Sequence, residues 1–211
     1  PLFLGVKYIS QHCTNTKLEK FVFSDRLIRS VQPLTTLPSL NRIEITNAEL
    51  DSVQVIGLRL KDLPSLVYLN LSNNKITSLE GIAACENLQM LNLSHNEIES
   101  GKFSIASKSL KSLVMNHNKL TQIPKTKHLL QACHTLNLSS NKIESLNGLE
   151  SYQNVRKLNL SLNRIEKIGE SLGKFSQLEN LDLSQNIISG TQEVRHKEGH
   201  QTQEGGGSQE A

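Results

Sequence analysis

The chain has 211 residues with a net charge of +3, 36% hydrophobic residues, 4% aromatic residues and no tryptophan. The length is enough for one domain with a continuous core, and the weak net charge gives no reason to expect nucleic acid or a membrane surface as a partner. No apolar run is long enough for a transmembrane helix, and an odd number of cysteines, three, argues against a framework of disulfides.

The first predicted element is an N-terminal cap over residues 1–17. This stretch lacks the pattern that follows it, and Leu4, Val6, Ile9 and Cys13 form an imperfect helical stripe. A cap is expected because the first strand of a stacked repeat array would otherwise expose its core.

Residues 18–189 are predicted to form about eight repeats of one short phrase. The clearest copy runs from Leu66 to Ile76 and has the pattern Leu-x-x-Leu-x-Leu-x-x-Asn-x-Leu, which is the leucine-rich-repeat signature. Its asparagine returns every 22 or 23 residues, at Asn74, Asn96, Asn118, Asn141, Asn163 and Asn186. Two degenerate copies precede these, with Arg26 and Ala48 in the asparagine position.

Each copy is predicted to supply one short strand followed by a turn. Apolar and polar residues alternate, so Leu69 and Leu71 point into the stack while Asn70 and Ser72 point out. The amide of Asn74 is expected to bond with turn backbone that would otherwise be buried without partners. Because one repeat is too thin to cover its own apolar face, the copies must stack. We therefore predict an α/β, right-handed, horseshoe-shaped solenoid with a parallel sheet on its concave side.

The segments that lead back from one strand to the next carry apolar residues at steps of three. An example is the series Leu79, Ile82, Cys85 and Leu88. Side chains three apart eclipse in a 3₁₀ helix, so we expect 3₁₀ or short helical turns on the convex side. Cys85 and Cys133 both occupy core positions and are expected to be small buried residues.

Two stretches depart from the repeat period. The spacing from Ala48 to Asn74 is 26 residues, and the extra residues are expected to form an outer bulge within residues 53–63. Residues 190–211 are polar and almost without aliphatic side chains, so this tail is predicted to be disordered.

The motif Asn-x-Ile-x-x-Leu-x-Gly-Ile/Leu, at residues 74–82 and 141–149, resembles one intracellular subfamily of leucine-rich repeats. That subfamily is typified by the nuclear regulatory subunit of protein phosphatase 1, and related repeats occur in dynein-associated, ciliary assembly and tubulin-cofactor proteins. The resemblance covers about residues 18–190. It implies a curved, non-enzymatic scaffold that binds another protein through its concave face, with phosphatase or cytoskeletal proteins as partners by analogy.

One short motif matches a catalytic signature. Residues 169–173 read Gly-Glu-Ser-Leu-Gly, the nucleophile elbow, and Asp182 and His196 follow Ser171 along the chain. The elbow requires a strand–turn–helix setting, whereas this peptide lies in a return segment and His196 lies in the predicted tail. We therefore expect no enzymatic activity.

His95 and His117 occupy the same position in adjacent repeats. Neighbouring strands lie about 4.8 Å apart, so the two rings are expected nearly to touch. A structural zinc site needs four ligands, and Asn73 and Ser140 fill the flanking positions. We expect no metal and no cofactor, and the pair is either part of a binding surface or simply solvated.

The outward strand positions are mostly small and polar, and the departures from this rule predict the contact surface. Aromatic and methionine anchors within a polar rim concentrate binding energy at protein interfaces. The predicted partner-binding residues are Tyr68, Met90, His95, Val114, His117, Lys157, Leu162 and Arg164. A mostly basic column either steers an acidic partner or is a solvated rim. It consists of Lys75, Glu97, Lys119, Lys142 and Arg164.

The sequence therefore favours a non-catalytic scaffold, cytoplasmic or nuclear, whose partner is another protein and not nucleic acid or a membrane. The alternative is a structural repeat segment of a larger multidomain protein, packed against other domains of the same chain. The chain begins at Pro1 rather than at a methionine, and no C-terminal cap is recognisable, which keeps this alternative open.

Overall fold

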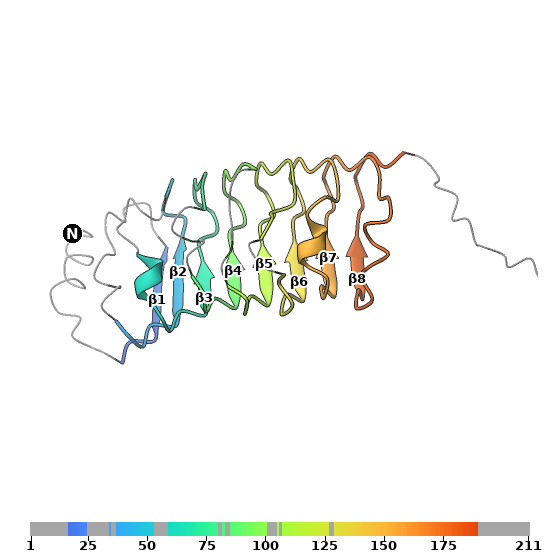
Figure 1. Ribbon diagram of the computed structural model, residues 1–211. Helices are drawn as coiled ribbons and strands as arrows, with labels where there is room; N and C mark the ends of the chain where they lie inside the picture. The colour runs from blue at the N-terminus through green and yellow to red at the C-terminus, as the bar shows by residue number, and fades with distance from the viewer. Residues whose placement is uncertain are drawn as a thin grey trace, which may run out of the picture.

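A computed structural model describes residues 17–24, 34, 37–52, 59–79, 82, 85–100, 105, 107–126 and 129–189. Within these ranges the chain forms one sheet of eight parallel strands, and their order in the sheet is their order in the sequence (Figure 1). The strands are β1 (Lys20–Ser24), β2 (Arg42–Thr46), β3 (Tyr68–Asn70), β4 (Met90–Asn92), β5 (Ser112–Val114), β6 (Thr135–Asn137), β7 (Lys157–Asn159) and β8 (Asn180–Asp182). The prediction of a leucine-rich-repeat solenoid is confirmed.

Equivalent leucines of successive repeats lie opposite one another in the sheet. Leu91 pairs with Leu69 on one side and with Leu113 on the other, and Ile43 of the degenerate second repeat pairs with Leu69. All four side chains are fully buried. Because a slip of one residue would turn each of them toward solvent, the core specifies the register.

The return segments are built from hydrogen bonds between residues three apart. Ile82 N–H donates to Leu79 O at 3.0 Å, and Cys85 N–H donates to Ile82 O at 3.2 Å. The same bonds recur where other return segments have apolar residues at steps of three, so the prediction of 3₁₀-type turns is confirmed. Where the whole turn is described, two of these turns are 3₁₀ helices, η2 (Leu60–Asp62) and η3 (Leu149–Ser151).

The prediction of an outer bulge within residues 53–63 is wrong for its last part. Leu60 and Leu63 are buried, and Leu63 N–H donates to Leu60 O just as in the other turns. The series Leu60, Leu63 and Leu66 is the same step of three, so this stretch packs into the core. Residues 53–58 lie outside the described residues, as do Arg26, the predicted tail and the predicted cap apart from residue 17.

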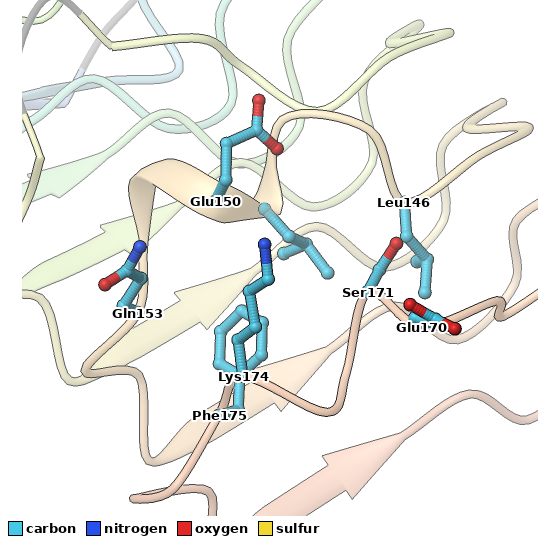
Figure 2. Close-up of a pocket in the computed structure, with 8 residues that line it drawn as sticks. Leu146, Glu150, Gln153, Glu170, Ser171, Lys174 and Phe175 are labelled. Atoms are coloured by element: carbon cyan, nitrogen blue, oxygen red, sulfur yellow. The ribbon is translucent and has the colours of Figure 1, made fainter.

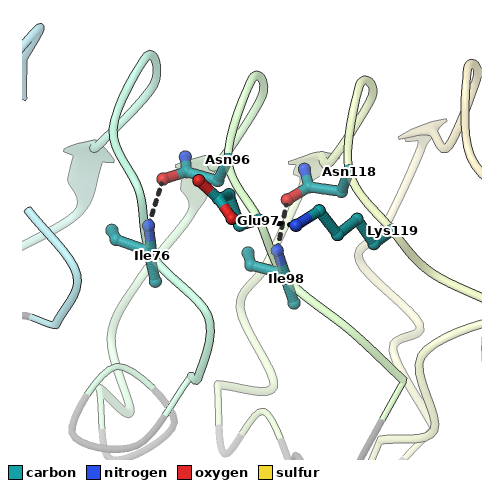
Figure 3. Close-up of polar contacts among 6 residues, drawn as sticks. All are labelled: Ile76, Asn96, Glu97, Ile98, Asn118 and Lys119. Atoms are coloured by element: carbon teal, nitrogen blue, oxygen red, sulfur yellow. Dashed lines mark hydrogen bonds and ion pairs between the residues drawn. The ribbon is translucent and has the colours of Figure 1, made fainter. Parts of the chain in front are cut away.

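The anchoring asparagines join each turn to the one before it (Figure 3). Asn96 Nδ2 donates to Leu93 O in its own turn and to Leu71 O in the preceding turn, both at 3.0 Å, and Asn96 Oδ1 accepts the N–H of Ile76 at 3.0 Å. The other asparagines of the series repeat these bonds. The expectation that the amide satisfies buried turn backbone is confirmed, and its partners belong to two turns.

Candidate interaction surface

One side of the sheet faces away from the core, and we call it the open sheet face. It consists of the alternate strand positions and of the residue after each strand that turns the chain out of the sheet. That residue has a left-handed backbone with φ between 54° and 57° in every turn from β2 to β8. We call this series the left-handed column, and it consists of Asn47, Asn73, His95, His117, Ser140, Leu162 and Gln185.

The serines predicted to point outward are not part of this surface. Ser72, Ser94, Ser139 and Ser161 are buried. Each lies between its strand and the left-handed residue, where the chain bends. In the turn of β6, Ser139 N–H and Oγ both bond to Asn137 Oδ1, at 3.1 and 2.9 Å. The alternation of a flat strand therefore stops one residue earlier than predicted.

The structure brings the predicted residues of β3, β4 and β5 together. Tyr68 lies opposite Met90, and Asn92 lies opposite Val114 in the next strand pair. The rings of His95 and His117 stack at the ends of β4 and β5, with centroids 4.2 Å apart and an interplanar angle of 13°. Met90 is 46% exposed, whereas Tyr68 and Val114 are only partly accessible.

Tyr68 is not the free anchor that the sequence predicted. The guanidinium of Arg42 lies over its ring, 3.6 Å from the centroid, in a cation–π contact. Arg42 Nε also bonds to Glu44 Oε1 at 2.9 Å, and Lys20 Nζ lies 3.4 Å from the same oxygen. The hydrogen bond from Arg42 lowers the pKa of Glu44. The outward side chains of Arg42, Glu44 and Tyr68 are thus engaged in contacts with one another or with Lys20.

The stacked histidines carry only two potential metal ligands. Partial burial, and secondarily the neighbouring His117, lower the pKa of His95. In the described part of the chain, no group of three or more His, Cys, Asp or Glu side chains is placed to hold a metal ion. Two imidazoles fall short of the four ligands of a structural zinc site.

Three predicted residues form a second group on β7 and on the turn that follows it. Lys157, Leu162 and Arg164 are all exposed, and Leu162 is 47% accessible in a left-handed backbone. Strand β6 separates this group from the first, and its outward side chains are Thr135 and Asn137. The eight predicted partner residues therefore divide into two groups on the same face.

The column predicted to be mostly basic contains ion-paired lysines in its first part and cations without an ion pair in the described residues in its last part. Lys75 Nζ lies 3.6 Å from Glu49 Oε2, and Lys119 Nζ lies 2.8 Å from Glu97 Oε2 (Figure 3). The bond to Lys119 lowers the pKa of Glu97. Lys142 and Arg164 follow on the next two turns, and no ion pair within the described residues involves either of them.

The nucleophile-elbow motif lies among the return segments, in a surface pocket between η3 and the return segment after β7 (Figure 2). The lining residues are Leu146, Leu149, Glu150, Gln153, Glu170, Ser171, Lys174 and Phe175. Asp182 belongs to the sheet, where its Oδ1 accepts bonds from Ser184, and His196 lies outside the described residues. Glu150, Glu170 and Lys174 are the titratable residues that line the described pocket around Ser171, and no histidine is among them.

The two described cysteines are free and buried, as predicted. Burial raises the pKa of Cys85 and of Cys133 to about 12. A thiol with such a pKa stays protonated at neutral pH, so neither residue is a nucleophile or a ready metal ligand in the folded chain.

Comparisons with known proteins agree with this geometry. A family model described as leucine-rich repeats in two copies matches residues 64–103 and 86–129. Comparison with curated proteins gives no sequence match. Within the described ranges, no helix has the length and apolar character needed to cross a bilayer.

Several solved structures share the fold. The leucine-rich-repeat domain of APL1B has a TM-score of 0.71 at 21% identity, with 82% of this chain and 49% of that chain covered. The internalin InlF of Listeria monocytogenes has a TM-score of 0.63 at 23% identity, with 84% and 58% covered. InlJ of the same organism, whose structure includes a cysteine ladder, has a TM-score of 0.64 at 26% identity, with 86% and 37% covered.

The chain thus spans less than two thirds of the length of each of these structures. What they share with it is the stacked parallel sheet. The chain carries leucine-rich repeats, which the family model matches over residues 64–129, and it has the fold of a leucine-rich-repeat solenoid.

Proposed function

We propose that the chain is a non-catalytic scaffold that binds a partner protein on the open sheet face. The observation that carries the proposal is the exposure of Met90 and Leu162, each nearly half accessible, on a sheet face that also carries many polar side chains. Neither side chain contributes to the core. Apolar anchors surrounded by polar residues are typical of protein-binding surfaces.

The resemblance to the protein phosphatase 1 regulatory subfamily supports a finer proposal. The partner is then a phosphatase or a cytoskeletal or ciliary protein, and the chain acts in the cytoplasm or nucleus without a cofactor. The motif at residues 74–82 and 141–149 carries this resemblance. The partner contacts include the stacked pair His95 and His117 and, at the edge, Lys157 and Arg164.

Affinity purification of the full chain from cells tests the proposal. The wild type is compared with a triple variant, Tyr68→Ala/Met90→Ala/Leu162→Asp. The matched control is Leu129→Asp, because Leu129 is 52% exposed but lies in a return segment away from the sheet. We expect the triple variant to lose proteins that the wild type and the control both retain. Unchanged capture by a folded triple variant would contradict binding on this face.

A second candidate function is packing against other domains of the same chain. It is favoured by the exposed apolar side chains of the last described turn, Leu181, Ile187 and Ile188. If this candidate is right, Ile187→Ser lowers the melting temperature of the complete protein while Met90→Ala does not. No difference between the two variants would remove it.

A further inference from the structure

We infer that Leu162, Lys142 and Arg164 bind an extended protein segment in which an apolar side chain is flanked by acidic ones. This inference rests on the proposed function and names the chemistry of the partner at one part of the open sheet face. Two independent departures from the repeat pattern meet at this place.

The first departure is the residue type at position 162. The other members of the left-handed column are asparagine, histidine, serine or glutamine. Leucine is disfavoured in a left-handed backbone because its Cβ crowds the following carbonyl, whereas asparagine is tolerated there. Leu162 is also nearly half exposed. The fold therefore gains nothing from a leucine here, and its apolar side chain is free to contact a partner.

The second departure is the arrangement of charge beside it. In the two earlier pairs of turns, a glutamate and a lysine face each other across adjacent turns. The next two turns instead place Lys142 and Arg164 side by side, and Arg164 N–H donates to Ile143 O at 2.9 Å. Glu144 and Glu166, two residues further along each turn, form no ion pair with them in the described part of the chain.

Backbone hydrogen bonds bring these two departures together. Asn141 N–H donates to Leu162 O at 3.2 Å, which places the residue before Lys142 directly against Leu162. Arg164 lies two residues after Leu162 on the same turn. The exposed leucine and the two cations therefore lie on the same pair of adjacent turns, where an anion placed near both cations would be attracted by both.

The partner chemistry follows from this arrangement. Adjacent turns are about 4.8 Å apart, and an extended chain advances about 3.3 Å per residue. One carboxylate can therefore lie between both cations, or two carboxylates can alternate along the segment, with the apolar side chain on Leu162. Base stacking of a nucleic acid needs aromatic side chains, and stable membrane binding needs several apolar ones. A single exposed leucine favours a protein segment over both.

A library of random dodecapeptides displayed on phage is the probe. We expect selection on the wild-type chain to enrich peptides with an apolar residue next to one or two acidic residues. A synthetic peptide of that kind is expected to bind about tenfold more weakly to Lys142→Glu/Arg164→Glu. Its affinity for Leu162→Asn should also fall, although we expect that variant to melt at a higher temperature than the wild type because asparagine tolerates the left-handed backbone. The matched controls are Lys174→Glu and Leu129→Asn, which lie in return segments.

A second experiment exchanges the charges of peptide and protein, so that loss of binding by Lys142→Glu/Arg164→Glu can be told apart from misfolding of that variant. Replacement of the peptide's acidic residues by lysine should abolish binding to the wild type and restore it to Lys142→Glu/Arg164→Glu. A misfolded variant cannot regain binding in this way.

The possible failures are distinguishable. Enriched peptides that lack acidic residues overturn this inference, and so do peptides whose binding survives the charge reversal. If the binding of those peptides still depends on Met90, the proposed function is supported and only the inference about Leu162, Lys142 and Arg164 fails. If no enriched peptide depends on either Met90 or Leu162, both proposals fail. Tighter binding of single-stranded RNA or anionic vesicles, lost on the same charge reversal, also overturns the inference.

Discussion

The interior turns and the last described turn have nearly the same sequence but differ in burial. Leu113 on β5 is 0% exposed, whereas Leu181 occupies the equivalent position on β8 and is 38% exposed. Asn118 is buried, and its equivalent Asn186 is only partly so. Among the described residues the difference lies in the neighbours, because β5 has a strand on each side and β8 has one. A turn therefore draws its stability from the turns around it.

The largest expected effect on the free energy of unfolding comes from truncating the two equivalent leucines, Leu113 and Leu181. Leu113→Ala should lower the free energy of unfolding by about 3 kcal/mol, because it opens a cavity in a packed core. Leu181→Ala should cost about 1 kcal/mol or less, since that side chain is already partly in water. Urea denaturation followed by circular dichroism measures both. Equal losses would show that the last turn is as well packed as the interior.

The asparagines should repeat the contrast on a smaller scale. Asn118→Ala leaves Ile98 N–H, Leu93 O and Met115 O without the bonds that the amide now makes. The expected loss is about 2–3 kcal/mol, because buried polar groups without partners are costly. Asn186→Ala exposes its partners more readily to water and should cost about 1 kcal/mol. Urea denaturation measures both losses of unfolding free energy. A smaller loss for Asn118→Ala than for Asn186→Ala would contradict the comparison.

Two glycines with positive φ sharpen the comparison further. Gly148 has φ 106°, and a Cβ there would lie 3.0 Å from Ile123 O, whereas Gly169 has φ 57° and open space around it. Gly148→Ala should cost about 2 kcal/mol from backbone strain together with the clash. Gly169→Ala should cost about 1 kcal/mol from strain alone. Melting temperatures of the two variants test the order, and a larger drop for Gly169→Ala would reverse it.

The smallest effect concerns charge on the surface of the interior turns. The pKa of His95 is lowered by partial burial and by the neighbouring His117. A lowered pKa in the folded state favours folding above the pKa of the unfolded chain, near 6.5, and this contribution is lost as the pH falls through the folded pKa. His117→Gln should raise the pKa of His95, as an NMR titration of the ring protons would show. An unchanged titration would mean that burial alone sets the value.

The core was predictable because one period governs it. The 22- or 23-residue return of the asparagine places Leu69 beside Leu91, and the stacking of His95 on His117 follows from the same period. The contact of Arg42 with Tyr68 was not predictable in this way, since it depends on which rotamer a long side chain adopts across two strands.

Two further features escaped the reasoning from patterns. The burial of Ser72 results from the left-handed turn that follows it, which alternation along a strand does not reveal. The core turn at Leu60 and Leu63 did have a signal, the same step of three, but the longer spacing after Ala48 suggested an insertion instead. In both places local backbone geometry overrode the simple repeat.

The amide of each anchoring asparagine reaches back to the preceding turn, as Asn96 does to Leu71 and Ile76. A polypeptide made from its amino terminus therefore completes the polar interior of one turn only when the next asparagine has been synthesised. Truncation of the chain after any interior turn would therefore leave the backbone of that turn without the partners that the next asparagine supplies. The polar interior of a turn is thus encoded one repeat downstream of the turn itself.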